Sequence, residues 1–571
     1  VKEQLDGSGG FAKFVYLNSS GTVTTPDAAG LPTSAQFQDI GYQAFRTGWT
    51  ENDQLLAFFS DNSDFGHNHF DDNSFILNAG GEWLLTDPGY VDSSTSATTT
   101  FTTGTVGHNA MLVNGAGQTI KSGGALAGFF TSPVFELGVG DATGSYATTP
   151  DVTQWKRRII TVKGDYHLIV DNVSLASSGT PEMLFHTDKT GKFTANGSPL
   201  TVGSPLPASF LIEKAKASVT VQLLRPSNAV RLYTRYTGAE QHGTYASVKT
   251  ASGVTQESFV TLIRPKVHRE GIIEAESLLP PAASGGSTAI VTMNKYYRVL
   301  SYSASGVNDS VTLNFNVPAS GVYDLRLGFG KNSVAGIVKA ELDGAPLQTG
   351  IDLYDSYYDT LETLHPNVNL TAGTHSLKLT VTGKNASSGG YNIVLDYVRL
   401  NPAGTAIGKA EAFPVSTATN GLATGIVVTL SGATDQLFVN PTNAAVTTAS
   451  NLTISCSATQ CLARKPTAGG YDRYAAVNTL VGGTNLSDGS QVLVNAPVGS
   501  AVALGKTSAT AWTGTVRLST TGSPQMYVPS VTSVKLNGTT LTAGQYSYNA
   551  TSKLLTLNNL SPGDYDIEVQ L

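Results

Sequence analysis

Short runs of alternating apolar and polar residues recur along the whole chain. Runs such as SVTVQLL and GTVRLST carry apolar side chains at every second position, the period of a strand with one buried face. Turns rich in Gly, Ser, Thr and Asn separate them, and in the first half the runs return about every 8 to 12 residues, a spacing typical of β-sandwiches. Long helical patterns are absent. The pattern predicts an all-β protein built from large antiparallel sheets.

Length and charge narrow the class further. A chain of 571 residues is too long for one domain and suggests roughly three or four. The formal net charge of -7 disfavours nucleic acid as a partner, because that partner rewards a basic face. No run of eighteen apolar residues occurs, so we expect no membrane span. The chain opens at Val1 directly into polar sequence without a signal peptide, which suggests a mature or truncated protein.

The patterning divides the chain into four parts. Residues 1–35 are Gly/Ser/Thr/Pro-rich and read as a lead-in arm or linker, and 36–270 read as a large multi-stranded antiparallel β-sandwich. Residues 271–402 form a self-contained β unit that reads as an insertion. Residues 403–571 read as a C-terminal β-sandwich region that partly completes the larger domain, with FVTLIRP before the insertion and DQLFVNP after it expected in one sandwich.

Reactive side chains concentrate between residues 64 and 118, where three of the nine histidines lie. His67 and His69 are two apart in a stretch that reads as extended, so both rings should face the same side. Asp87 ends a strand before a Pro-Gly turn, and His108 opens the next strand. The intervening Ser/Thr-rich segment, 91–106, reads as a long loop.

His69, Asp87 and His108 make a plausible two-histidine, one-carboxylate metal set, which suits Zn²⁺ or Mn²⁺. Metal-bound histidines need an acceptor for the second ring nitrogen, and Asp71 or Asp72 could supply one. On spacing alone, ordinary structural histidines and aspartates explain these residues equally well.

The strings HNHFDDNSF, LLTDPGY and GHNAMLVNG, in this order, resemble the β-sheet portion of the heparinase II/III-like polysaccharide lyases over about residues 35–265. The resemblance implies that His69, Asp87 and His108 bind the metal and that His67 is the active-site histidine. It also implies β-elimination on a uronic-acid glycan, hence a secreted or cell-surface bacterial protein with an acidic polysaccharide as partner. Histidine suits proton transfer. Arg46 could face the sugar's negative charge, although surface or paired roles are commoner for such an arginine.

Two features depart from that family. Its members place a helical toroid, which supplies a catalytic Tyr, before the β domain, and no such pattern occurs here. Many also carry a Tyr in the loop after the DPG turn, where Tyr90 is the nearest tyrosine. The chain therefore reads as the C-terminal part of a lyase whose helical half is a separate fragment, with little activity alone. The alternative is a non-catalytic carbohydrate-binding, adhesive or structural extracellular surface protein.

The inserted unit resembles a calcium-containing jelly-roll carbohydrate-binding module, on its opening IIEAESL and its closing GGYNIVLDYVRL. The resemblance implies Ca²⁺ held by Glu274, Glu276 and Asp396, which are hard oxygen donors; exposed strand acids are the alternative. A sugar platform needs an aromatic ring with polar partners. The candidates are Tyr296, Tyr297, Asn385 and Tyr391, although core packing would explain each tyrosine equally well.

Cys456 and Cys461 are the only two cysteines. Such close spacing favours a loop disulfide in a secreted protein over a metal site, which would need further ligands.

Overall fold

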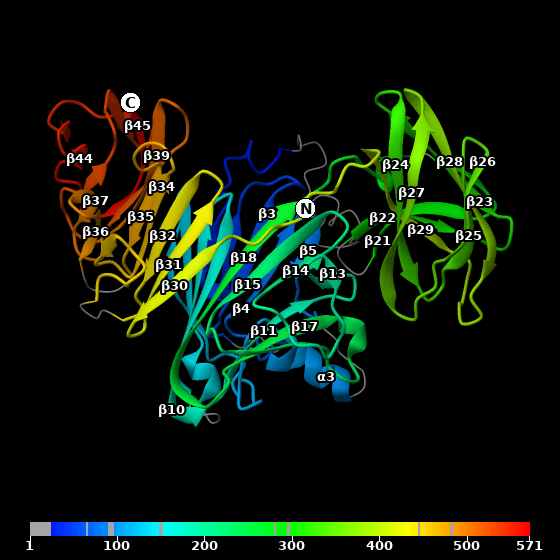
Figure 1. Cartoon of the computed structure of the whole chain (residues 1–571), viewed down its shortest axis with the longest axis horizontal. Coiled ribbons are helices and arrows are strands. Elements are labelled where there is room, and N and C mark those ends of the chain that lie inside the picture. The colour runs from blue at the N-terminus through cyan, green and yellow to red at the C-terminus, as the bar shows by residue number, and fades with distance from the viewer. Residues whose placement is uncertain are drawn as a thin grey trace, which may run out of the picture.

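The structure, a computed structural model, describes residues 24–63, 67–89, 96–147, 152–278, 281–293, 297–442, 446–479 and 483–571. Antiparallel sheets dominate the regular structure of these residues, which confirms the all-β prediction (Figure 1). No helix within the described ranges is long and apolar enough to cross a membrane.

The first region contains three sheets. The sheet that carries the histidines has five strands in the order β1 (Ala35–Phe37), β2 (Tyr42–Arg46), β3 (Gln54–Phe59), β4 (Ser74–Ala79) and β5 (Glu82–Leu85). A nine-stranded sheet lies behind it, in the order β13 (Ser198–Pro199), β12 (Lys192–Ala195), β14 (Ser209–Glu213), β15 (Ala217–Arg225), β18 (Val254–Val267), β10 (Tyr166–Gly179), β9 (Val152–Val162), β8 (Phe135–Asp141) and β7 (Ala125–Phe130). The smallest sheet runs β16 (Val230–Thr234), β17 (Thr244–Lys249), β11 (Pro181–Thr187) and β6 (Met111–Val113).

The inserted unit is a two-sheet sandwich with its own core (green at the right of Figure 1). One sheet runs β21 (Ser287–Met293), β22 (Tyr297–Ser303), β29 (Ile393–Pro402), β24 (Gly321–Asn332) and β27 (Tyr358–Leu370), with β19 (Ile272–Glu274) also paired to β29. The facing sheet runs β20 (Ala282–Ser284), β23 (Ser310–Val317), β28 (Gly373–Lys384), β25 (Gly336–Leu342) and β26 (Ala345–Asp352). Because β19 and β29 are its first and last strands, its two ends leave side by side.

The C-terminal region is a second sandwich (yellow to red in Figure 1). Its large sheet runs β30 (Val415–Asn420), β31 (Ala423–Leu430), β32 (Ala433–Val439), β34 (Gln460–Pro466), β35 (Arg473–Val477), β38 (Ala501–Lys506), β39 (Ala511–Leu518), β45 (Gly563–Gln570), β41 (Ser533–Leu536) and β42 (Thr539–Thr540). Its small sheet runs β33 (Ile454–Cys456), β36 (Thr484–Asp488), β37 (Gln491–Ala496), β40 (Gln525–Tyr527), β44 (Leu554–Leu557) and β43 (Tyr546–Asn549). Cys456 and Cys461 are joined by a disulfide.

The nine-stranded sheet is buried on both faces. On β9, Ile159 belongs to the core shared with the five-stranded sheet, while its neighbour Ile160 belongs to a core shared with the ten-stranded sheet. Successive side chains of a strand point to opposite faces, so a doubly covered strand is apolar almost throughout. FVTLIRP on β18 and DQLFVNP on β32 therefore meet by packing face to face. They lie in two different sheets that share this core.

The Ser/Thr-rich segment was predicted as a loop, but residues Ser96–Thr103 form helix α3. Thr102 and Thr103 donate their hydroxyl groups to the carbonyl groups of Thr98 and Thr99 one turn earlier. Phe101 is buried in a small apolar cluster and anchors the helix. Threonine is a weak helix former, so tertiary packing overrides its propensity here.

Candidate functional site

A cleft of about 520 Å³ lies over the five-stranded sheet, beside the histidine-rich segment. β2, β3 and β4 supply its floor, and the segments after residues 66 and 86 supply its side. His67 is exposed at this cleft, while His69 lies deeper and is half-buried. The lining residues are Ile40, Tyr42, Ala57, Phe59, Asp61, His67, Asn68, His69, Asp71, Ser74, Phe75, Ile76, Asp87 and Gly89.

Beneath the cleft, two histidines and two aspartates form one cluster. His69, Asp71 and His108 each offer a ligand atom, and these atoms lie within 4.8 Å of one another. Asp87 joins through its Oδ2 atom, which is 2.7 Å from Nδ1 of His108. The buried Oδ1 of Asp71 and Nε2 of His108 have no hydrogen-bond partner among the described residues. Buried polar atoms left over in this way fit a bound cation, so this group could hold a metal ion.

Charge within the cluster is balanced by His108. Burial alone would lower the pKa of His108, but the attraction and hydrogen bond of Asp87, together with Asp71, raise it overall. Burial would raise the pKa of Asp87, yet His108 holds it below its usual value. Burial also raises the pKa of Asp71 to about 6 and, with help from His108, lowers that of His69 to about 4. His69 is therefore neutral near pH 7, as a metal ligand must be.

Asn109 and Arg157 hold the base of the cluster in place. The Asn109 amide donates to the carbonyl groups of Phe75 (2.7 Å) and Thr86 (3.2 Å). Arg157 is fully buried, pairs with Asp171 at 2.7 Å and donates to the carbonyl oxygen of Asn109 at 2.5 Å. These contacts tie the strands on both sides of His108 together, and a fixed backbone presents its ring in one orientation.

The structure separates the roles of Asp71 and Asp72. Asp72 was expected as a possible partner for a histidine, but its carboxylate accepts from the backbone of Asp61 (2.8 Å) and Gly124 (3.0 Å) and from the Ser145 hydroxyl (2.7 Å). It is a buried tie between loops. The chain turns at Asp72 and Asn73 just before β4, and of the two aspartates only Asp71 reaches the cluster.

Tyr42 is a cleft residue that sequence reasoning missed. It packs on Phe59 with ring centroids 4.7 Å apart, and its side chain lines the cleft with His67. Burial, followed by Asp71 and Asp87, raises the pKa of Tyr42 to about 12, so the phenol keeps its proton at neutral pH. The signal was present in GYQAFR, because Tyr42 and Arg46 share one face of β2.

Of the other predicted catalytic residues, the structure describes only Arg46. The Arg46 guanidinium stacks on the Trp49 ring at 4.6 Å, and Arg46 does not line the cleft. Trp49, only three residues away, holds the Arg46 side chain away from the cleft. Tyr90 lies outside the described residues.

The predicted calcium ligands are brought together, but around a lysine. Lys216, from the nine-stranded sheet's domain, places its ammonium 2.8 Å from Glu274 and 2.9 Å from Asp396. Arg269 binds the other oxygen of Glu274 at 2.5 Å. An ammonium thus occupies the position expected for Ca²⁺, and these residues do not fit that ion as arranged. Glu276 is not part of this ion-pair network, and burial raises its pKa.

The predicted sugar platform is also used internally where the structure describes it. Asn385 donates to Asp352 at 2.9 Å and accepts from the backbone of Ser387, so it shapes its own loop. Tyr391 packs against the module core with Lys384 over its ring at 5.1 Å. Tyr296 and the side chain of Tyr297 lie outside the described residues.

Comparisons with known proteins agree with the sequence resemblance. Residues 29–272 match the family model described as heparinase II/III-like, C-terminal. A search of the curated proteins found no match.

Solved structures that resemble the chain include two lyases and one carbohydrate-binding module. A heparinase III is 15% identical with a TM-score of 0.35, covering 50% of this chain and 40% of its own. The heparan sulfate lyase HepC from Pedobacter heparinus is 15% identical with a TM-score of 0.34, covering 48% and 41%. A CBM36-1 domain of a xylanase from the hindgut metagenome of Trinervitermes trinervoides is 25% identical with a TM-score of 0.18, covering 24% and 98%.

The chain thus spans only about two fifths of the length of the lyases it resembles. The family match covers β1 through β18 and includes the cleft and its cluster. Residues 29–272 are thus similar to the C-terminal domain of the heparinase II/III-like family.

Proposed function

We propose that this chain is the β-rich part of an extracellular polysaccharide lyase that cleaves a uronic-acid-containing glycan by β-elimination. The observation that carries the proposal is the open cleft in which exposed His67 and protonated Tyr42 lie above the His69–His108 cluster. A site with accessible proton-transfer groups on a rigid sheet is the arrangement that such chemistry needs.

The reaction removes the C5 proton of a uronate and expels the glycosidic oxygen from C4, leaving a C4–C5 double bond. Neutralising the uronate carboxylate makes that proton acidic, and a donor must protonate the departing oxygen. His67 suits contact with the carboxylate or proton transfer, because an imidazole can both donate and accept a proton. Tyr42 suits donation, because its raised pKa keeps the phenol protonated.

The cluster would hold a divalent metal, for which zinc is the best match to imidazole and carboxylate donors. We assign His69, Asp71 and His108 as ligands, with Asp87 orienting the His108 ring through its contact with Nδ1. Bound there, the metal would supply positive charge and lock the base of the cleft. The proton transfers are assigned to side chains above it.

A helical partner domain, as in the family, would supply the opposite wall. We therefore expect weak glycan binding and little elimination from this chain alone. The Cys456–Cys461 disulfide supports a location in an oxidising compartment, where such bonds persist.

Calorimetry of the full chain with oligogalacturonate, and ultraviolet absorbance of the unsaturated product, test the proposal. His67→Ala and Tyr42→Phe should each weaken binding about tenfold or more, the loss of one charged or well-formed contact. Lys339→Gln, at a half-buried ion-paired site in the inserted unit, is the control. Equal binding by all four proteins would contradict a glycan role for this cleft.

A further inference from the structure

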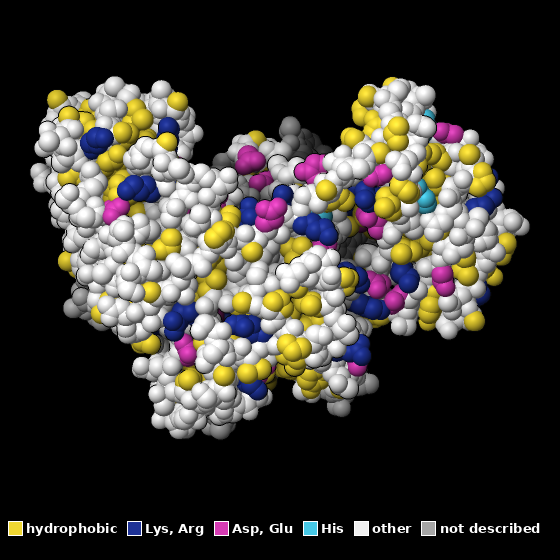
Figure 2. All heavy atoms as spheres, viewed as in Figure 1, with side chains coloured by type: hydrophobic (Ala, Val, Ile, Leu, Met, Phe, Trp, Pro, Cys, Tyr) yellow, Lys and Arg dark blue, Asp and Glu magenta, His cyan; other side chains and the backbone are white. Residues whose placement is uncertain are grey.

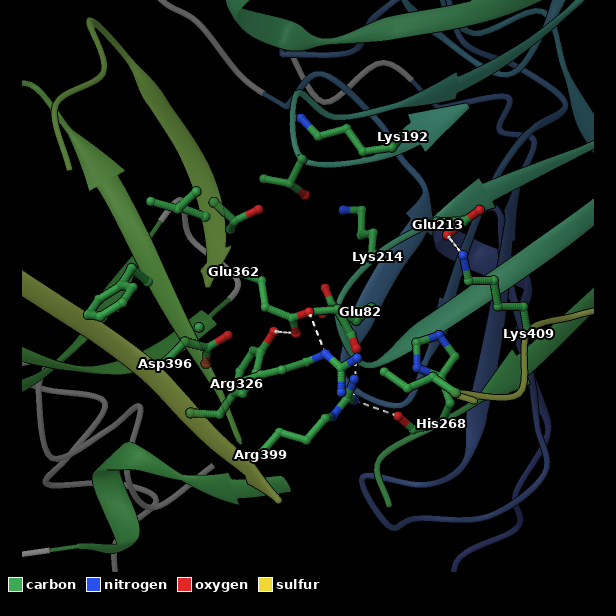
Figure 3. A pocket seen from close by; sticks show the side chains of 18 of the residues that line it. Glu82, Lys192, Glu213, Lys214, His268, Arg326, Glu362, Asp396, Arg399 and Lys409 are labelled. Carbon is green, nitrogen blue, oxygen red and sulfur yellow. Dashed lines mark hydrogen bonds and ion pairs between the residues drawn. The ribbon is translucent and has the colours of Figure 1, made fainter. Parts of the chain in front are cut away.

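A second cleft, of about 580 Å³, lies at the junction between the nine-stranded sheet's domain and the inserted unit (Figure 3). Glu213, Lys214 and His268 line one wall, and Arg326, Glu362 and Arg399 line the other. Figure 2 shows Lys, Arg, Asp and Glu side chains gathered at this junction on a face that is otherwise sparsely charged. The inserted unit therefore meets its neighbour across a charged, solvent-accessible space.

Two arginines lie directly opposite each other on the inserted unit's wall. Arg326 on β24 and Arg399 on β29 are partners in the strand register. Like charges directly opposite in a sheet destabilise it. Glu362 offsets one of them, at 3.2 Å from Nε of Arg326, and also accepts from the Tyr397 hydroxyl at 2.7 Å. One carboxylate thus faces two guanidinium groups.

The unsatisfied groups on this wall are donors. Arg399 is 1% exposed and donates through Nη2 across the junction to the carbonyl groups of Ala215 (2.9 Å) and His268 (2.7 Å). Its Nε and the Nη1 of Arg326 have no hydrogen-bond partner among the described residues. Buried N–H groups without acceptors are costly, and a guanidinium prefers a carboxylate.

The carboxylates that line the cleft already have donors. Glu213 pairs with Lys409, and Asp396 with Lys216 at 2.9 Å. Glu82 accepts from the backbone of Lys216 at 3.2 Å. A cation would therefore find no open ligand set, whereas an incoming anion would meet the two arginines.

We propose that the junction cleft is a second glycan-binding site, in which Arg326 and Arg399 bind the carboxylate of an acidic sugar. That the ligand is an acidic glycan rests on the proposed function. That the site prefers an anion rests only on the unpaired N–H groups of Arg326 and Arg399. Binding there would cross-link the inserted unit to the larger domain, because the cleft has walls from both.

The junction site is distinct from the His67 cleft, and the two share no lining residue. Strand β5 connects them, with Glu82 in the junction cleft and Asp87 just beyond the other end of the strand. Five residues of strand span roughly 16 Å. One acidic chain long enough to bridge that distance could occupy both sites.

Calorimetry of the full chain with tetragalacturonate tests the site, with cellotetraose as the neutral probe. Arg326→Gln should weaken tetragalacturonate binding at least tenfold. Arg326→Lys should weaken it less, because lysine keeps the positive charge but lacks the paired N–H donors of the guanidinium. Lys339→Gln is the matched control, since it removes an ion-paired cation from the inserted unit's other sheet. Its affinity should equal that of the wild type.

His67→Ala separates this proposal from the lyase proposal. Tetragalacturonate binding that survives His67→Ala and falls with Arg326→Gln supports the junction site even if no elimination is ever seen. An Arg326→Gln affinity within twofold of wild type would overturn it, as would complete loss of binding in His67→Ala or equal binding of cellotetraose. Inorganic sulfate should compete better than chloride at matched ionic strength; equal competition would indicate charge screening and count against a site.

Discussion

Two clusters in this molecule carry the residue types of a metal site, and they differ in what surrounds them. Among the described residues, no lysine or arginine forms an ion pair with Asp71 or Asp87 in the histidine cluster, and the buried Asp71 Oδ1 and His108 Nε2 atoms have no hydrogen-bond partner. The acids of the inserted unit, Glu274 and Asp396, close around the ammonium of Lys216. Both segments of the sequence contain residues that can bind a metal ion. In the inserted unit, however, Lys216 from the neighbouring domain already supplies the positive charge, so no ion is needed there.

Removing the Lys216 ammonium should produce the largest change in the free energy of unfolding. Lys216→Ala leaves the mostly buried Asp396 carboxylate without its cation and Glu274 with Arg269 alone, which costs up to about 3–5 kcal/mol in unfolding free energy. The same variant should gain stabilisation by millimolar Ca²⁺, because an oxygen-donor pair is then exposed to the ion. Denaturant unfolding with and without Ca²⁺ measures both effects.

Lys192→Ala serves as the matched control, because its ion pair with Asp359 is largely exposed and should contribute little. Adding Asp396→Asn to Lys216→Ala should abolish the response to Ca²⁺. A wild-type protein that is itself strongly stabilised by Ca²⁺ would show that the lysine does not fill the site.

The two carboxylates of the histidine cluster should differ in their effect on metal affinity. The sequence makes Asp87 the ligand, whereas the ligand atom that converges on both histidines belongs to Asp71. Loss of a residue that only orients a ligand costs roughly 10- to 100-fold in affinity, and loss of a ligand costs more. Zinc competition titrations should therefore show a larger loss of zinc affinity for Asp71→Asn than for Asp87→Asn. Asp72→Asn is the control, because the Asp72 carboxylate only connects loops, and this variant should bind zinc as the wild type does.

The smallest expected effect is on the way the free energy of unfolding depends on pH. Burial raises the pKa of Asp72 to about 7, so between about pH 4 and 7 the folded state holds a proton that the unfolded chain has lost. Stability of the metal-free protein should therefore fall as pH rises through that window. Asp72→Asn should flatten the slope in denaturant unfolding at several pH values; an unchanged slope would show that Asp72 is ionised throughout.

Features that depend on local sequence pattern could be predicted from the sequence. Alternation predicted the strands, and spacing brought His67 and His69 to one cleft with His108 beneath it. The sequence could not place Lys216 beside Asp396, because 180 residues separate them and the contact exists only after two domains dock. It also missed α3, since threonines carry no helical signal until Phe101 is buried.

The same limit applies to Arg326 and Arg399. Each is an ordinary strand residue in sequence, and their direct opposition follows from the register of β24 and β29. Tyr42 is the intermediate case, because its position on one face of β2 was readable but its neighbours were not. Sites built within one sheet are thus more predictable than sites built between domains.

The most direct test of the central claim is the zinc content per chain of three proteins: the wild type, His69→Ala, and the double variant Glu274→Gln with Asp396→Asn. We expect about one zinc in the wild type and the double variant, and close to none in His69→Ala. Equal zinc in wild type and His69→Ala, or a loss confined to the double variant, would contradict the assignment of the metal to the histidine cluster.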